Sequence, residues 1–159
     1  MANEKNNILP LSEYMDTERI LIFPGKQEKD DILNALIDTL ADLSGIDGRD
    51  DIARGIFHRE SLLSTGIGNG IALPHVRLND LDKIYVAAAI IPEGIEDYGS
   101  LDEQPVRFVF MVVAGKERKT IHVNLLRSIT KLLSAPATVQ ALLTATEPEA
   151  CMVLIRQSE

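Results

Sequence analysis

The chain has 159 residues and a formal net charge of −8, and 45% of its residues are hydrophobic. This length and composition predict one globular domain over residues 1–159 with a sizeable apolar core. The acidic balance argues against nucleic acid or an anionic membrane surface as a partner, because both are negatively charged. The sequence has no apolar run of the ~20 residues that a membrane-spanning helix needs, and its polar N-terminus lacks the apolar segment of a signal peptide. We therefore expect a cytoplasmic protein without direct membrane insertion, with flexible residues 1–7.

The segment before residue 64 is expected to be mainly helical. In chain order it is predicted to hold a short helical turn, a strand and two helices, over residues 9–15, 19–23, 26–43 and 50–62. The first long helix is amphipathic, because its apolar residues recur at helical spacing. Gly45 follows it and can cap its C-terminus.

The most informative stretch is Ser64 to His75, which reads S-T-G-I-G-N-G-I-A-L-P-H. Its three glycines stand at alternate positions, and glycine permits positive φ and close approach of the backbone to a ligand. Residues 71–73 are predicted to form a strand, and Pro74 then stiffens the backbone that presents His75. The order of the glycines fits neither the dinucleotide-binding motif nor a P-loop.

The second half of the chain alternates between apolar strands and helices. Residues 84–91 and 106–114 are predicted strands that are apolar on both faces, with a connection over 92–99 that could hold a short edge strand. Three helices are expected after them, over 120–133, 136–143 and a last segment ending at 155, which a capping-box pattern at 146–149 would open. Strands that are apolar on both faces need helices on both sides. The pattern therefore predicts an α/β fold, a three-layer α/β/α sandwich around a mixed, mostly parallel sheet of about four to five strands.

Three side chains are candidates for chemistry. A neutral imidazole at His75 is a nucleophile near pH 7, although a histidine closing a strand can be purely structural. His122 falls at the N-terminal end of the buried face of its predicted helix, where it is either a core residue or a donor to a bound anion. Arg59 lies at a helix end, where it either pairs with an anion or caps the helix dipole.

The glycine-rich stretch itself could contact an anion. The Thr65 hydroxyl and the backbone N–H groups of Gly66 and Gly68 are candidate phosphate ligands, although the glycines can equally serve turn geometry alone. We interpret His58 as a surface residue and Cys151 as a packing residue without a neighbouring base. The spacing of histidines and cysteines matches no metal-binding motif, so no metal site is predicted.

Residues 65–75 closely resemble the active-site signature of the type-2 enzyme IIA domains of the bacterial sugar phosphotransferase system, the fructose, mannitol and nitrogen-regulatory group. Arg59-Glu60 upstream, Gln104-Pro105-Val106 and the helix that carries His122 extend the resemblance over the whole chain. The resemblance implies a phosphocarrier whose His75 accepts a phosphoryl group from the small carrier HPr, or a paralogue, and passes it to a IIB domain. It implies catalytic roles for His122 and Arg59, and neither a cofactor nor a metal.

The resemblance leaves the output of that chemistry open. Stand-alone members of the family are often regulators of the nitrogen type, whose phosphorylation state controls binding to other proteins. A small hydrolase that uses His75 is a third interpretation, and it has little support because no nucleophile motif such as G-x-S-x-G is present.

Overall fold

The computed structural model describes residues 9–44 and 48–159, so the predicted flexible segment 1–7 and the predicted cap Gly45 lie outside the described residues. The elements follow one another as η2 (Leu11–Glu13), η3 (Thr17–Arg19), β1 (Ile20–Ile22), α1 (Lys29–Ser44), α2 (Arg49–Leu62), β2 (Gly66–Gly68), β3 (Ile71–Ala72), β4 (His75–Leu78), β5 (Ile84–Ile95), β6 (Val106–Gly115), α3 (Lys119–Leu132), α4 (Pro136–Thr144) and α5 (Pro148–Gln157).

The strands form one mixed sheet in the order β1-β5-β6-β3-β2, and β4 also pairs with β6. The long strands β5 and β6 are antiparallel, as are the short strands β2 and β3, whereas β1 runs parallel to β5, and β3 and β4 run parallel to β6. β3 and β4 lie one after the other along the same edge of β6, with Ile71 opposite Phe108 and His75 opposite Val112. They therefore behave as one strand that is interrupted at Leu73-Pro74.

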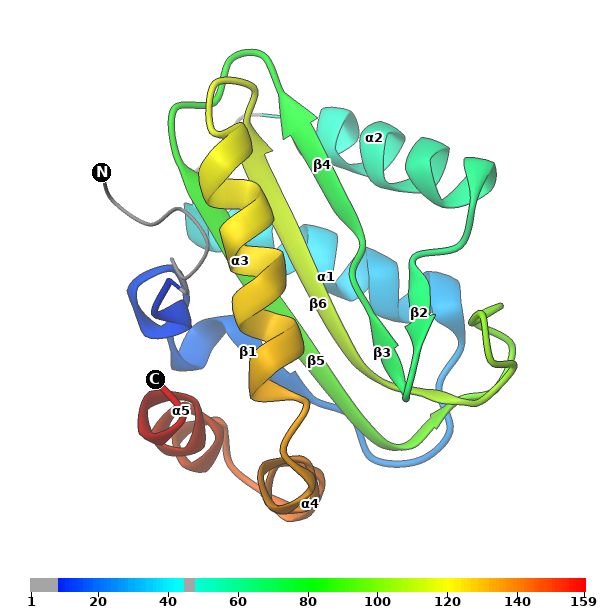
Figure 1. Cartoon of the computed structure of the whole chain (residues 1–159). Helices are drawn as coiled ribbons and strands as arrows, with labels where there is room; N and C mark the ends of the chain where they lie inside the picture. The colour runs from blue at the N-terminus through cyan, green and yellow to red at the C-terminus, as the bar shows by residue number, and fades with distance from the viewer. Residues whose placement is uncertain (1–8, 45–47) are drawn as a thin grey trace.

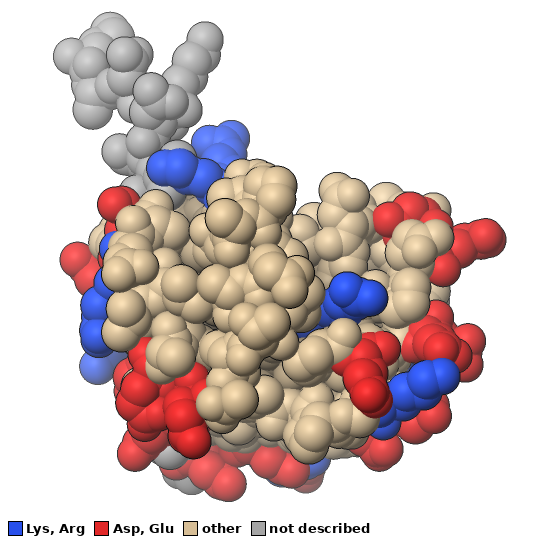
Figure 2. Space-filling model, turned by 90° about the horizontal axis from the view of Figure 1, so that it is seen from below, with Lys and Arg blue, Asp and Glu red and all other residues tan. Residues whose placement is uncertain are grey.

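Helices cover both faces of the sheet (Figure 1). Side chains that alternate along β6 separate the two cores: Phe108 and Phe110 pack in the core that α3, α4 and α5 share, and Val109 and Met111 pack in the core of α1 and α2. The predicted three-layer α/β/α architecture is thus confirmed. α4 carries no charged residue, and the side of the molecule seen from below is largely uncharged, with acidic residues around its edge (Figure 2).

The structure differs from the predicted elements in its short strands, at the end of β5 and at the start of α5. The short strands β2 and β4 were not predicted, and β5 continues through Pro92 to Ile95 instead of ending at Ile91. Proline is tolerated there because β1 pairs with β5 only as far as Ile90, and no strand in the described part of the chain pairs with that edge of β5 beyond it. The predicted capping box was wrong: α5 begins at Pro148 with Glu147 as its N-cap and without a side-chain capping hydrogen bond.

Candidate functional site

His75 is the first residue of β4, immediately after the interruption in the sheet. Its register opposite Val112 places its side chain on the face that α3 covers, because paired residues of neighbouring strands point to the same side. The backbone is held there by the N–H of Val112, which donates to the Pro74 carbonyl at 3.0 Å. The imidazole is half-buried, so it is fixed by the fold and still open to a partner.

A backbone hydrogen bond determines which ring nitrogen of His75 is available. His75 Nδ1 lies 2.8 Å from the carbonyl oxygen of Leu73. A carbonyl oxygen can only accept a hydrogen bond, so Nδ1 carries the proton and Nε2 keeps its lone pair. The neutral ring is therefore oriented as a nucleophile at Nε2.

His122 lies beside His75, as its predicted role requires. It belongs to the first turns of α3, its ring centroid is 5.0 Å from that of His75, and the two rings are nearly perpendicular at 84°. Only 5% of the residue is exposed. Burial, and then the nearby charges of His75 and Arg77, lower the pKa of His122 to about 4. The ring is thus neutral at pH 7 and has one N–H to donate.

Arg59 caps the end of α2 in this structure. Its Nη1 donates to the carbonyl oxygen of Leu63 at 2.6 Å. Within residues 9–44 and 48–159, no hydrogen bond or ion pair joins it to His75. This arrangement matches the alternative in which Arg59 stabilises the C-terminus of its helix, and its contact with a phosphoryl group stays a prediction.

Thr65 is a member of a buried polar cluster behind the site. Its N–H and its hydroxyl donate to the two carboxylate oxygens of Glu60 at 3.0 and 2.7 Å, and its hydroxyl oxygen lies 2.9 Å from that of Tyr98. Lys29 pairs with the same carboxylate at 3.0 Å and lies 4.3 Å from the centre of the Tyr98 ring. The single hydroxyl proton of Thr65 is thus already used, so contact with a phosphoryl group would require this cluster to rearrange.

The glycine N–H groups also have partners. Gly66 donates to the Ser64 hydroxyl at 3.2 Å and Gly68 to the Ser100 hydroxyl at 3.1 Å. A Cβ on Gly66 would lie 2.9 Å from the Cα of Ser100, so this position needs glycine for close packing. Gly68 pairs opposite Ile71, which places it on the order of 10 Å along the strands from His75. These contacts match the turn-geometry alternative, and phosphate binding by the two glycines stays a prediction.

The remaining candidates have the expected surroundings. His58 is exposed on α2, which confirms its interpretation as a surface residue. Cys151 is fully buried, and burial raises the pKa of its thiol, so its packing role is confirmed. Among the described residues, no group of three or more His, Cys, Asp or Glu side chains could hold a metal ion.

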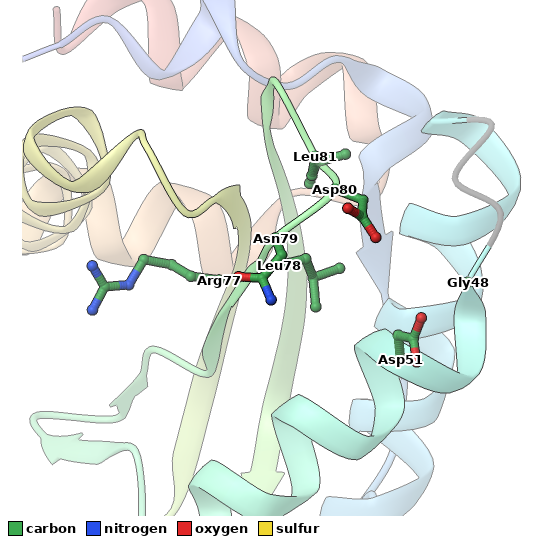
Figure 3. Close-up of a pocket in the computed structure, with 7 residues that line it drawn as sticks. All are labelled: Gly48, Asp51, Arg77, Leu78, Asn79, Asp80 and Leu81. Carbon is green, nitrogen blue, oxygen red and sulfur yellow. The ribbon is translucent and has the colours of Figure 1, made fainter.

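A cavity of about 360 Å³ lies near the other end of β4 and does not include either histidine. It is lined by Gly48, Asp51, Arg77, Leu78, Asn79, Asp80 and Leu81. Figure 3 shows that the Arg77 side chain extends away from Asp51 and Asp80, to the opposite side of β4. Arg77 is close enough for its charge to act on His122, and it was not among the predicted site residues because β4, which places it two residues after His75 on a strand, was not predicted.

The fold and the site define a three-layer α/β/α domain that presents an oriented histidine beside a second, neutral one. Residues 13–158 match the model of the family described as "Phosphoenolpyruvate-dependent sugar phosphotransferase system, EIIA 2", and the chain belongs to this family. No helix in the described part of the chain is long and apolar enough to cross a membrane.

Similar proteins come from both branches of the family. A nitrogen regulatory protein of Bradyrhizobium diazoefficiens is 32% identical over 79% of this chain and 80% of its own length. The fructose-specific EIIABC component of Bacillus subtilis is 28% identical over 95% of this chain, which spans only 24% of that longer protein.

Two solved structures share the fold at low sequence identity. The nitrogen regulatory protein IIA-Ntr of Neisseria meningitidis has a TM-score of 0.81 at 21% identity, covering 91% of this chain and 98% of its own. The mannitol enzyme IIA of Escherichia coli, solved in complex with phosphorylated enzyme IIB, has a TM-score of 0.73 at 20% identity, over 90% of this chain and 97% of its own.

Proposed function

We propose that the protein is a phosphocarrier that accepts a phosphoryl group on Nε2 of His75 from a phosphohistidine of an HPr-type carrier protein. The hydrogen bond from His75 Nδ1 to the Leu73 carbonyl carries this proposal, because it leaves Nε2 as the nucleophilic nitrogen. The half-buried position of the ring, next to a second histidine, suits transfer between two docked proteins.

The transfer is a direct exchange between two imidazoles. The Nε2 lone pair forms a bond to phosphorus while the nitrogen–phosphorus bond of the donor breaks, and the electron pair of that bond returns to the donor's ring nitrogen. Each ring keeps the proton on its other nitrogen, so the exchange requires no proton transfer. Positioning and charge stabilisation are then the main contributions of the protein.

His122 would donate its N–H to a phosphoryl oxygen. Because its ring is neutral at pH 7, it supplies a hydrogen bond without a full positive charge, and the first turn of α3 adds the favourable end of the helix dipole. Arg59 would have to leave the Leu63 carbonyl to reach the same group. Substitutions of His122 and Arg59 test both roles.

The relatives support two outcomes of the phosphorylation of His75. The relative from Bacillus subtilis is an EIIABC component, and the E. coli mannitol enzyme IIA forms a complex with phosphorylated IIB, which supports transfer to a IIB domain. The Bradyrhizobium relative is a nitrogen regulatory protein, which supports the alternative that phosphorylation of His75 controls binding to target proteins. A cytoplasmic location, which was expected from the missing apolar segments of the sequence, stays a prediction.

The test is phosphorylation of the purified protein by a panel of phosphorylated HPr-type carriers. Intact-mass spectrometry should show one acid-labile phosphoryl group, which His75→Ala removes and the matched control His58→Ala retains. A labile phosphoryl group on the folded His75→Ala protein would refute the assignment. Onward transfer to a sugar-specific IIB domain supports transport, whereas capture of other proteins that depends on phosphorylation supports regulation.

A further inference from the structure

The guanidinium of Arg77 lies on the same face of the sheet as the two histidines. On β4, Arg77 pairs opposite Ala114 as His75 pairs opposite Val112, and both partners face the core beneath α3. Residues two apart on a strand point the same way and are about 7 Å apart. An extended arginine side chain spans that distance, so its guanidinium can reach the space in front of the His75 ring.

The charge of Arg77 is available to a ligand. The residue is exposed, and its side chain extends away from the acidic residues Asp51 and Asp80 on the other side of β4 (Figure 3). Within the residues that the structure describes, its guanidinium forms no hydrogen bond or ion pair. After burial and the charge of His75, the positive charge of Arg77 also lowers the pKa of His122, which agrees with its place on the same face of the sheet.

Arg59 contrasts with Arg77 in this respect. Its guanidinium is engaged with the Leu63 carbonyl at the end of α2. A phosphoryl group bonded to Nε2 of His75 carries negative charge on three oxygens, for which a planar guanidinium is the strongest side-chain partner. Of the two arginines, the one already free to turn toward these oxygens is Arg77.

We propose that Arg77 is a catalytic residue of the phosphoryl transfer, which pairs with the phosphoryl oxygens as the group arrives on His75. This inference rests on the proposed function, since it requires that His75 is the acceptor. The chemistry at phosphorus is unchanged. Arg77 contributes a fixed positive charge, and its interaction with the phosphoryl oxygens strengthens as the bond to Nε2 forms.

The test compares the wild-type protein with Arg77→Gln, Arg77→Lys and the control Arg107→Gln. Arg107 is an exposed arginine on β6, near the Gly70 turn and five residues from the position opposite His75. Single-turnover phosphorylation should slow by about 10- to 100-fold in Arg77→Gln, less in Arg77→Lys, and not at all in Arg107→Gln. Thermal melting of each variant verifies the fold.

A second measurement on the isolated phosphorylated protein excludes an effect on partner docking. The pKa of the phosphoryl group, followed by phosphorus NMR against pH, should rise by about half a pH unit to one pH unit in Arg77→Gln, because a nearby positive charge favours the dianion. Arg77→Lys keeps the charge, so its phosphoryl pKa should stay near that of the wild type. If Arg77→Gln does not fold, Arg77→Lys serves as the informative variant.

The outcomes separate this inference from the proposed function. A wild-type protein that no phosphorylated carrier modifies at His75 overturns both. A wild-type protein that is modified, with Arg77→Gln unchanged in rate and in phosphoryl pKa, overturns only the role of Arg77. A slower Arg77→Gln with an unchanged phosphoryl pKa would mean that Arg77 steers the partner protein, and this result also overturns the proposed contact.

Discussion

Gly55, in the middle of α2, determines how closely that helix packs on the strand that begins with His75. A Cβ added at Gly55 would lie 2.2 Å from Cγ2 of Val76 and 3.2 Å from its Cβ. Carbon atoms prefer about 3.5–4.0 Å, so the first contact is far inside the repulsive range. We predict that Gly55→Ala destabilises the protein and shifts β4, although alanine alone would favour the helix by about 1 kcal/mol.

The expected size follows from these two opposing effects. Overpacking of a filled core costs about 1–3 kcal/mol, which exceeds the gain in helix propensity. The net loss should be on the order of 1 kcal/mol, and for a protein of this size each kcal/mol lowers the melting temperature by about 2–4 °C. Single-turnover transfer to His75 should also slow, because Val76 follows His75 directly on β4.

A double-mutant cycle with Val76→Ala tests the reasoning. That substitution removes Cγ2 and leaves the Cβ contact of 3.2 Å. In this background Gly55→Ala should become neutral or stabilising, which corresponds to a coupling energy of about 1–3 kcal/mol. The measurements are urea unfolding and transfer rate for the four proteins. Additive free energies, or a stabilised Gly55→Ala single variant, would refute the close packing of α2 on β4.

Four further predictions concern His122, Glu60 and Arg59. Because the pKa of His122 is about 4 in the folded protein, the unfolded chain takes up a proton at this residue first as the pH falls below 6.5. Between pH 7 and pH 5, the free energy of unfolding of the wild type should therefore fall by about 2 kcal/mol more than that of His122→Gln. Equal losses for the two proteins in urea unfolding would contradict this. At pH 7, His122→Ala should slow transfer strongly and His122→Gln, which keeps an N–H donor, only in part. Glu60→Gln should lower stability by about 2–4 kcal/mol, because it breaks a buried pair with Lys29, whereas Glu96→Gln, which breaks an exposed pair, should change little; similar melting of both variants would contradict the role of burial. Arg59→Ala should slow transfer about tenfold or more, and a variant that only melts earlier would limit Arg59 to capping α2.

The layers of the fold were predictable because they depend on periodicity. The predicted strands that correspond to β5 and β6 are apolar on both faces. Strands of this kind belong in a sheet that helices cover on both sides. The short strands were not predictable in the same way. β2 contains two glycines and β4 follows a proline, so local propensity argues against a strand at either place. Pairing of β2 with β3 and of β4 with β6 forms these strands nevertheless.

The candidate site was predictable only as far as residue types and spacing reach. The role of His122 beside His75 was implied by the family resemblance, and the structure places the two rings next to each other. The hydrogen-bond partners of Thr65 and Arg59 depend on how separate elements meet, as the contact of Thr65 with Tyr98 shows. The place of Arg77 beside the histidines required β4, which was not predicted.

The interruption of the sheet at Leu73-Pro74 has a consequence for how this site can change during evolution. The group that selects the reactive nitrogen of His75 is a main-chain oxygen, which every amino acid at position 73 would supply. Replacing the Leu73 side chain therefore leaves the tautomer preference intact as long as the backbone keeps its path. The reactivity of the imidazole is inherited with the chain topology, so divergence in partner choice can proceed through the surrounding surface without altering the nucleophile.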